Sequence, residues 1–289
     1  MRFLFAPGFA SSGPVHVALA LGAMVAIVSA LVGVFTVVRS QSFAGHALTD
    51  VATAGGAGAG YLGVNALAGF VVGSLAGGVA METIGVQRVR SRDVATGIVL
   101  GAATGCSALF FYLEANTGST TGSTQRILFG SLFEVAPGTL PVVGLLGVAT
   151  VGALVCIGRA LLLSSVSPEM ATVGGIATRS VSVIFMLTLA VSVGLSSVAI
   201  GAILSTALLI GPAASALRLA RTMRGALVLA SVLGVVATSL GVLLAYDSYN
   251  WSSRHAPLPV SFFVVVIVVA TYALTYVPVL RRRAMTGRS

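Results

Sequence analysis

Lysine is absent from this chain of 289 residues, so its 16 basic residues are all arginine. A P-loop nucleotide site uses a lysine to reach the phosphates of its nucleotide. The absence of lysine therefore excludes a P-loop ATPase within this chain. Hydrolase signatures such as H-E-x-x-H and G-x-S-x-G are missing too, and only three histidines could partner the many serines. The sequence contains no constellation typical of an enzyme.

Charged residues are also scarce. They make up 8% of the chain, whereas soluble domains carry roughly a quarter. A water-facing surface cannot be built from so few ions. The mean hydropathy is +1.05, and apolar runs of roughly 20 residues, the length needed to cross a bilayer, recur along the chain. The composition predicts an integral membrane protein in which 1–289 forms a single transmembrane domain.

Hydropathy predicts an all-α, polytopic transmembrane helical bundle with about nine spans. The predicted spans are approximately 15–38, 43–62, 66–84, 94–112, 142–163, 181–198, 201–217, 226–245 and 260–280. The second is unusual because it is rich in glycine and alanine and contains polar residues. Outside the spans, 127–141 is predicted to be amphipathic or re-entrant. The connection 164–179 is predicted to hold one short helix that ends at glycine.

The arginines orient these spans. Basic loops resist translocation, so arginines beside apolar spans mark the cytoplasmic side. They follow the first, third, seventh and ninth spans, and all fall on one side if the N-terminus is outside. The connection 164–179 falls on that side as well, whereas the polar loops 114–125 and 246–259 fall outside. The net charge of +9 is therefore typical of membrane topology rather than of nucleic-acid binding.

His46 and Asp50 are the strongest candidates for chemistry. They are four residues apart within the second predicted span, so on a helix they share one face. Imidazole and carboxylate are good ligands for first-row divalent metals, and both groups are costly inside a membrane. Two alternatives remain open at this point. The two side chains could bond only to each other, or the helix could begin later and leave them in an interfacial loop.

The other reactive side chains have simpler interpretations. Cys106 and Cys156 lie in apolar runs and are predicted to be small buried residues. The remaining acids near the cytoplasmic surface are predicted to lie in water: Glu82, Asp93 and Glu169. On the outer side, Glu114 and Glu134 are predicted to lie on a wet surface or in an entry vestibule.

Five short motifs resemble the membrane permeases of manganese, zinc and iron ABC importers, the ABC-3 type. V-V-R-S-Q-S-F-A-G-H-A-L-T-D-V at 37–51 resembles their first signature. The others follow in the family's order along the chain: S-R-D-V-A-T-G-I at 91–98, I-L-F-G-S-L at 127–132, S-P-E-M-A with a nearby glycine at 167–174, and A-L-L-I-G-P-A-A at 207–214. A single motif of this kind is weak evidence, whereas five in order are specific.

The resemblance implies a type II importer fold like that of the vitamin B12 importer, and an assembly around it. Two permeases would pair, as a homodimer or with a similar chain, and P-loop ATPase subunits would dock on the cytoplasmic side. An extracytoplasmic binding protein would deliver the metal, and no cofactor would be held permanently. The segment 164–179 matches the part that contacts the ATPase, which implies coupling roles for Pro168, Glu169, Met170, Ala171, Gly174 and Gly175.

One position pair departs from the family pattern. The first signature usually reads G-D-x-x-S-H. Here His46 stands at the position of the family's acid, and Asp50 stands at the position of its histidine. Both ligand types remain one helical turn apart, so the pair still predicts a site for a divalent ion in transit. A siderophore or cobalamin permease, an ion-driven secondary transporter and a non-transporting membrane scaffold remain the alternative functions.

Overall fold

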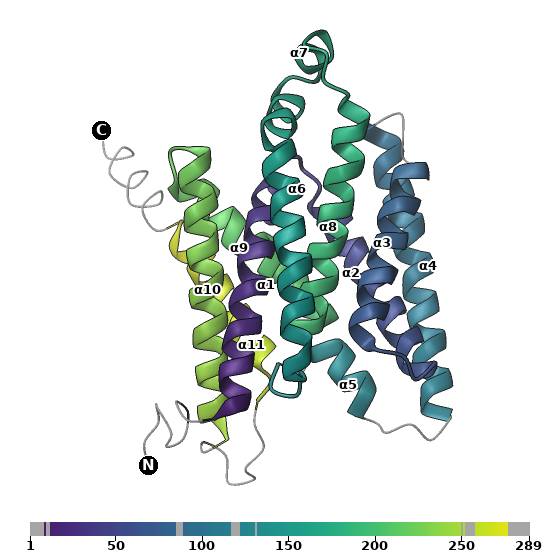
Figure 1. The fold of residues 1–289 in the computed structure, drawn as a ribbon, viewed down its shortest axis with the longest axis vertical. Coiled ribbons are helices and arrows are strands. Elements are labelled where there is room, and N and C mark those ends of the chain that lie inside the picture. The colour runs from purple at the N-terminus through teal and green to yellow at the C-terminus, as the bar shows by residue number, and fades with distance from the viewer. Residues whose placement is uncertain are drawn as a thin grey trace, which may run out of the picture.

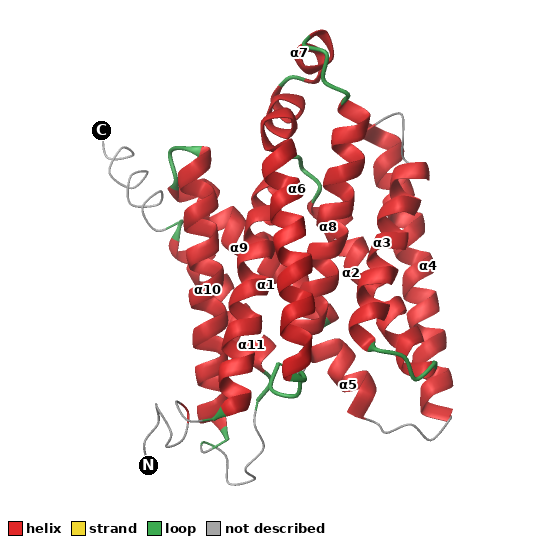
Figure 2. Cartoon of the chain, viewed as in Figure 1, coloured by secondary structure: helices red, strands yellow, loops and turns green. Residues whose placement is uncertain are grey.

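The computed structural model describes residue 9 and residues 12–84, 89–116, 122–130, 132–249, 251 and 258–276. This part of the chain contains helices and loops and no strand (Figures 1 and 2). The helices are α1 (Gly13–Val38), α2 (Ser42–Tyr61), α3 (Ala66–Ile84), α4 (Val89–Asn116), α5 (Gly122–Phe129), the 3₁₀ helix η2 (Pro137–Thr139), α6 (Leu140–Val166), α7 (Pro168–Val173), α8 (Thr178–Ile200), α9 (Ala202–Leu219), α10 (Met223–Ser248) and α11 (Val260–Leu274).

Seven helices in the described residues are long and apolar enough to cross a membrane: α1, α3, α4, α6, α8, α9 and α10. Each of the nine predicted spans overlaps a helix, but two of these helices are not both long and apolar enough to count as membrane spans. The helix α11 has 15 described residues, and α2 is diluted by glycines and polar side chains. The all-helical membrane bundle is confirmed, whereas the count of about nine spans is not.

The helices form two groups joined by α8 (Figure 1). In the first group, α1 packs against α6, α9 and α10, and α11 packs against α9 and α10. In the second, α2 packs against α3 and α4. The helix α8 contacts α1 in the first group and α2 and α3 in the second. Because α2 also contacts α9, it lies with one side against each group.

Small residues bring α2 and α3 close together. A Cβ on Gly55 would lie 2.8 Å from the Cα of Gly73, and it would meet the carbonyl oxygen of Gly69 even more closely. Side chains at these positions would force the helices apart. The glycine-rich character of the second span therefore serves helix packing, and α2 remains one unbroken helix from Ser42 to Tyr61.

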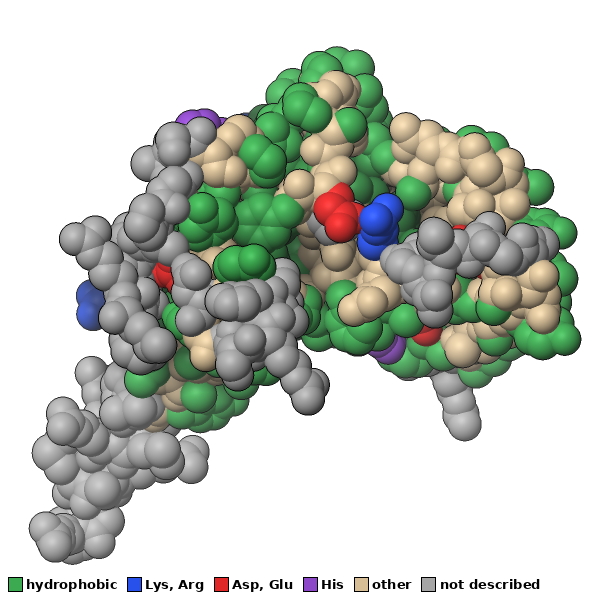
Figure 3. All heavy atoms as spheres, turned by 90° about the horizontal axis from the view of Figure 1, so that it is seen from below, with side chains coloured by type: hydrophobic (Ala, Val, Ile, Leu, Met, Phe, Trp, Pro, Cys, Tyr) green, Lys and Arg blue, Asp and Glu red, His purple; other side chains and the backbone are tan. Residues whose placement is uncertain are grey.

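The short helices α5 and α7 lie at opposite ends of the bundle (Figure 1). Chain direction places the starts of α8 and α10 and the ends of α1, α6 and α9 at the α7 end. Arg39, Arg179, Arg218, Arg221 and Arg224 flank those helix ends. The predicted basic side that carries 164–179 therefore agrees with the fold, and the end of α4 and the start of α5 lie on the opposite side, as predicted. Residues 117–121 of the predicted polar loop and the arginines after the ninth predicted span lie outside the described residues. Figure 3 views the α5 end, where most described side chains are apolar or uncharged.

Two glycines hold α5 against the turn between α8 and α9. Gly130 and Gly201 have φ angles of +78° and +86°. A Cβ on Gly130 would lie 2.6 Å from the backbone nitrogen of Gly201. A Cβ on Gly201 would in turn collide with backbone atoms of residues 128–130. The contact is made backbone to backbone, so only glycine satisfies both the left-handed angle and the spacing.

Candidate functional site

His46 and Asp50 lie on α2 and reach toward different neighbouring helices. The imidazole Nδ1 of His46 is 3.4 Å from the Thr206 hydroxyl on α9. The Thr104 hydroxyl on α4 donates a 3.4 Å hydrogen bond to Oδ2 of Asp50. His46 is exposed in the single chain, and Asp50 is half-buried. The pair therefore occupies an accessible strip of α2 that is flanked by α4 and α9.

Hydroxyl groups continue this polar contact between α2 and α9. The Thr49 hydroxyl lies 3.2 Å from that of Ser205 and 3.3 Å from that of Thr206. Thr49 and Ser205 are buried, with 2% and 1% exposure. His46 thus projects from the edge of a buried hydroxyl cluster that steadies its ring. Because Nδ1 faces Thr206, the imidazole has its Nε2 left to bind another group.

Both alternatives left open by the spacing are wrong. The helix does not begin late, because α2 starts at Ser42 and both residues are helical. The two side chains do not bond only to each other, because each has a threonine partner on another helix. Sequence reasoning missed these partners, Thr104 and Thr206, since nothing local distinguishes them from other threonines in apolar spans.

A single chain supplies few metal ligands. Among the described residues, no group of three or more histidine, cysteine, aspartate or glutamate side chains could hold a metal ion. His46 and Asp50 could offer one imidazole nitrogen and one carboxylate, whereas first-row divalent ions usually take at least four ligands. Water, or groups from a second copy of the chain, would have to complete the shell. A sparse site of this kind suits an ion that passes through.

The segment predicted to contact an ATPase forms an exposed cap on the bundle. The helix α7 begins at Pro168, has Glu169 in its first turn and ends at Val173, with Gly174 as its C-cap. Gly175 then takes a φ of +75°. The short helix with a glycine stop is therefore confirmed. Ala171 is fully buried toward the bundle, whereas Met170 and Val173 are 69% and 90% exposed.

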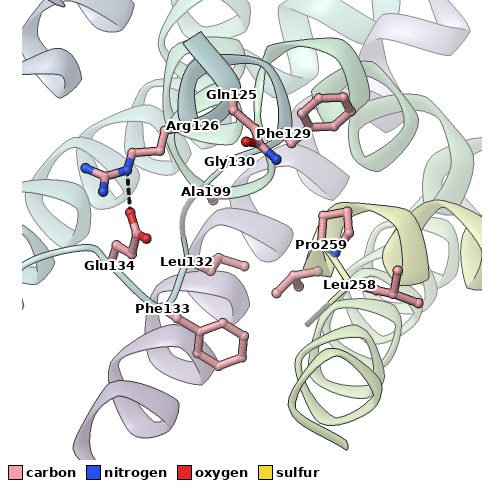
Figure 4. Close-up of a pocket in the computed structure, with 11 residues that line it drawn as sticks. Gln125, Arg126, Phe129, Gly130, Leu132, Phe133, Glu134, Ala199, Leu258 and Pro259 are labelled. Atoms are coloured by element: carbon pink, nitrogen blue, oxygen red, sulfur yellow. Dashed lines mark ion pairs between the residues drawn. The ribbon is translucent and has the colours of Figure 1, made fainter. Parts of the chain in front are cut away.

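A cavity of about 360 Å³ opens at the opposite end, between α5 and the start of α11 (Figure 4). Its lining is mainly apolar, with one ion pair at the rim, in which Nε of Arg126 lies 2.7 Å from Oε2 of Glu134. The side chain of Glu134 is 53% exposed, as predicted. Glu114 is 3% exposed beside Gly60, so its predicted position on a wet surface is wrong. Cys106 and Cys156 are exposed, so their predicted burial is wrong as well.

Comparison with known proteins identifies relatives along most of the chain. The model of the ABC 3 transport family matches residues 14–276. The high-affinity zinc uptake system membrane protein ZnuB of Haemophilus influenzae is 30% identical over 233 residues, which cover 80% of this chain and 88% of ZnuB. The manganese transport system membrane protein MntC of Listeria innocua is 29% identical over 280 residues, which cover 94% of this chain and 97% of MntC.

A solved structure shares the fold. The structure of PsaBC from Streptococcus pneumoniae in complex with Fab superposes with a TM-score of 0.79 at 23% identity, and 93% of each chain is covered. The seven apolar helices and these relatives together show that the protein is a multi-pass protein of the cell membrane. The match over 14–276 shows that this chain belongs to the ABC 3 transport family.

Proposed function

We propose that this chain is the permease subunit of an ATP-binding-cassette importer that moves a divalent metal ion, manganese, zinc or iron, across the cytoplasmic membrane. The observation that carries the proposal is the accessible His46 and Asp50 strip on α2, in a chain whose family and relatives are metal permeases. Imidazole and carboxylate are costly in lipid and useful to a divalent ion, so a metal path explains their presence.

The path runs along the α2 strip between two permease copies. Beside it, α4 presents Gly97, Gly101 and Gly105, and a Cβ added to any of them would meet no atom within 4 Å. This face leaves open space beside the strip, and a homodimer would bring two His46 and Asp50 pairs to one path. The proposed architecture is the type II importer fold, with α2 and α11 completing about nine spans in a single transmembrane domain over 1–289.

The energy for transport comes from separate P-loop ATPase subunits docked on α7. The chain has no lysine and so cannot form the phosphate site itself. The exposed Met170 and Val173 suit a protein interface better than water. An extracytoplasmic metal-binding protein delivers the ion at the α5 end, and no cofactor is bound permanently.

Reconstitution tests this function. Vesicles that contain the permease, its ATPase and its binding protein should take up manganese or zinc only when ATP is present. Uptake of a siderophore or cobalamin instead of the free metal would favour the related permease class. Uptake that follows a proton or sodium gradient without the ATPase would indicate a secondary transporter. The absence of any flux would support a membrane scaffold.

Thiol labelling tests whether the α2 strip faces water. In a variant with Cys106→Ala and Cys156→Ala, we expect Gly101→Cys to react quickly with a water-soluble thiol reagent in the assembled importer. Gly101 lies about one helical turn from Thr104, the hydrogen-bond partner of Asp50. Val148 is the comparison position for a surface that faces lipid, because it lies on α6 and is 73% exposed. Thiolates form in water and not in lipid. Val148→Cys should therefore react slowly, and the reverse order would place the strip in lipid.

Substitution on α7 tests the ATPase contact. Val173→Asp places a charge on a 90% exposed apolar position, which would be buried when the ATPase docks. We expect ATPase binding to weaken by about tenfold or more, the effect of losing a well-packed interface residue. The measurement is the dissociation constant of ATPase and permease. Ala136→Asp, at an exposed position near the opposite end, should leave it unchanged. Equal dissociation constants for the unaltered permease and the two variants would show that α7 is not part of the ATPase interface.

A further inference from the structure

Arg39 connects the turn before α2 with the helices that carry α7. It follows the last residue of α1, and its Nη1 donates hydrogen bonds to the Ser164 and Ser165 hydroxyls at 3.2 and 3.5 Å. Its guanidinium also lies over the Phe185 ring, 5.4 Å from the ring centre. The serines belong to the last turn of α6 and the phenylalanine to α8. Arg39 thus contacts both helices that flank α7.

The same turn leads directly into the His46 and Asp50 strip. Ser40 has a φ of +55°, the only positive value among the described residues other than glycine, and α2 begins at Ser42. His46 follows a single helical turn later. The connection between α1 and α2 is therefore short and tightly bent. This connection has little slack, so a shift of Arg39 would reach the start of α2 without being absorbed.

A role limited to membrane orientation does not account for this geometry. An arginine that only marks the cytoplasmic side would extend into water or toward lipid headgroups. Arg39 is half-buried and uses the planar guanidinium for stacking and its N–H groups for two hydroxyls on another helix. Lysine could not reproduce that combination, because its ammonium is a point charge without a flat face.

We propose that Arg39 is a positioning residue that transmits movement of the ATPase-docking helix α7 to the metal strip on α2. The inference rests on the proposed function. ATPase closure moves α7 with the ends of α6 and α8, and Arg39 carries that displacement into the turn before α2. Coupling between distant sites needs a physical connection whose two ends shift together, and this contact supplies one.

The test is the number of metal ions moved per ATP hydrolysed. The complete importer is reconstituted with ATPase and manganese-loaded binding protein, and both rates are measured in the same vesicles. We expect Arg39→Gln to lower manganese moved per ATP by roughly tenfold, within the usual range of coupling effects, while ATP hydrolysis continues. Arg39→Lys should give an intermediate ratio, because it keeps the charge and loses the fork.

Arg218→Gln is the matched control. Arg218 also stacks on aromatic rings at the α7 end, with its guanidinium 3.6 Å from the Tyr276 ring centre and 5.8 Å from the Tyr272 ring centre, but it joins α9 to the end of α11. Its loss should leave the ratio of manganese to ATP unchanged. A merely structural arginine would lower the yield of folded importer and reduce both rates together, without changing the ratio.

The combined variant Ser164→Ala, Ser165→Ala removes the hydroxyl partners without deleting a charge. It should lower the ratio by itself and add little to Arg39→Gln, because both changes break one connection. This variant decides the question if Arg39→Gln does not fold. An unchanged ratio in these variants, with normal transport by the unaltered importer, would overturn the role of Arg39 alone. Absence of metal uptake by the unaltered importer would instead refute the proposed function.

Discussion

His46→Ala is expected to lower metal uptake by the reconstituted importer by about 10- to 100-fold, and Asp50→Ala should have a similar effect. Loss of even an outer-shell partner costs a metal site this much. Here each variant removes one of the two ligands proposed for the α2 strip. The measurement is the initial rate of manganese or zinc uptake with ATPase and binding protein present in equal amounts.

The exchanged order of the pair provides a sharper control. A double variant, His46→Asp with Asp50→His, keeps one imidazole and one carboxylate a helical turn apart and restores the order of the family signature. It should recover most of the uptake that each single alanine variant loses. Tyr61→Phe, at the far end of α2, should behave like the unaltered protein. Normal uptake by both alanine variants would remove His46 and Asp50 from the path.

Gly201→Ala is expected to destabilise the folded protein by about 2–5 kcal/mol. A left-handed backbone costs a residue with a Cβ about 1–2 kcal/mol, and overpacking adds about 1–3 kcal/mol. Both apply here, because Gly201 has a φ of +86° and its Cβ would collide with the backbone around Gly130. Thermal unfolding in detergent should show a clear drop in midpoint, accompanied by a low yield.

Gly63→Ala separates the two contributions. Gly63 has a φ of +67°, but a Cβ there would meet no atom within 4 Å. This variant should lose only the conformational part, about 1–2 kcal/mol. Gly101→Ala, in open space on α4, should be nearly neutral. If Gly201→Ala unfolds at the same temperature as Gly63→Ala, the backbone contact between α5 and the α8–α9 turn is not tight in solution.

Local sequence information was sufficient for the membrane class, the helices and the family. Burying apolar surface in lipid depends on runs of neighbouring residues, so hydropathy located every long helix. The end of α7 was also predictable, because a glycine stop acts within one turn of its helix. The count of spans was harder to predict, because α2 is long enough to span the membrane but contains many glycines and polar side chains. Hydropathy cannot decide such a case, since it does not include the tight packing of α2 on α3.

The surroundings of His46 and Asp50 depended on tertiary structure. Their threonine partners lie 160 and 54 residues away in the sequence, and Arg39 reaches serines 125 and 126 residues away. No local pattern encodes such distances. Burial was equally hidden, because an apolar helix face has the same composition whether it meets lipid or protein. For that reason Cys106 and Cys156 proved exposed and Glu114 buried, and only the packing of separate helices determined which side chains meet.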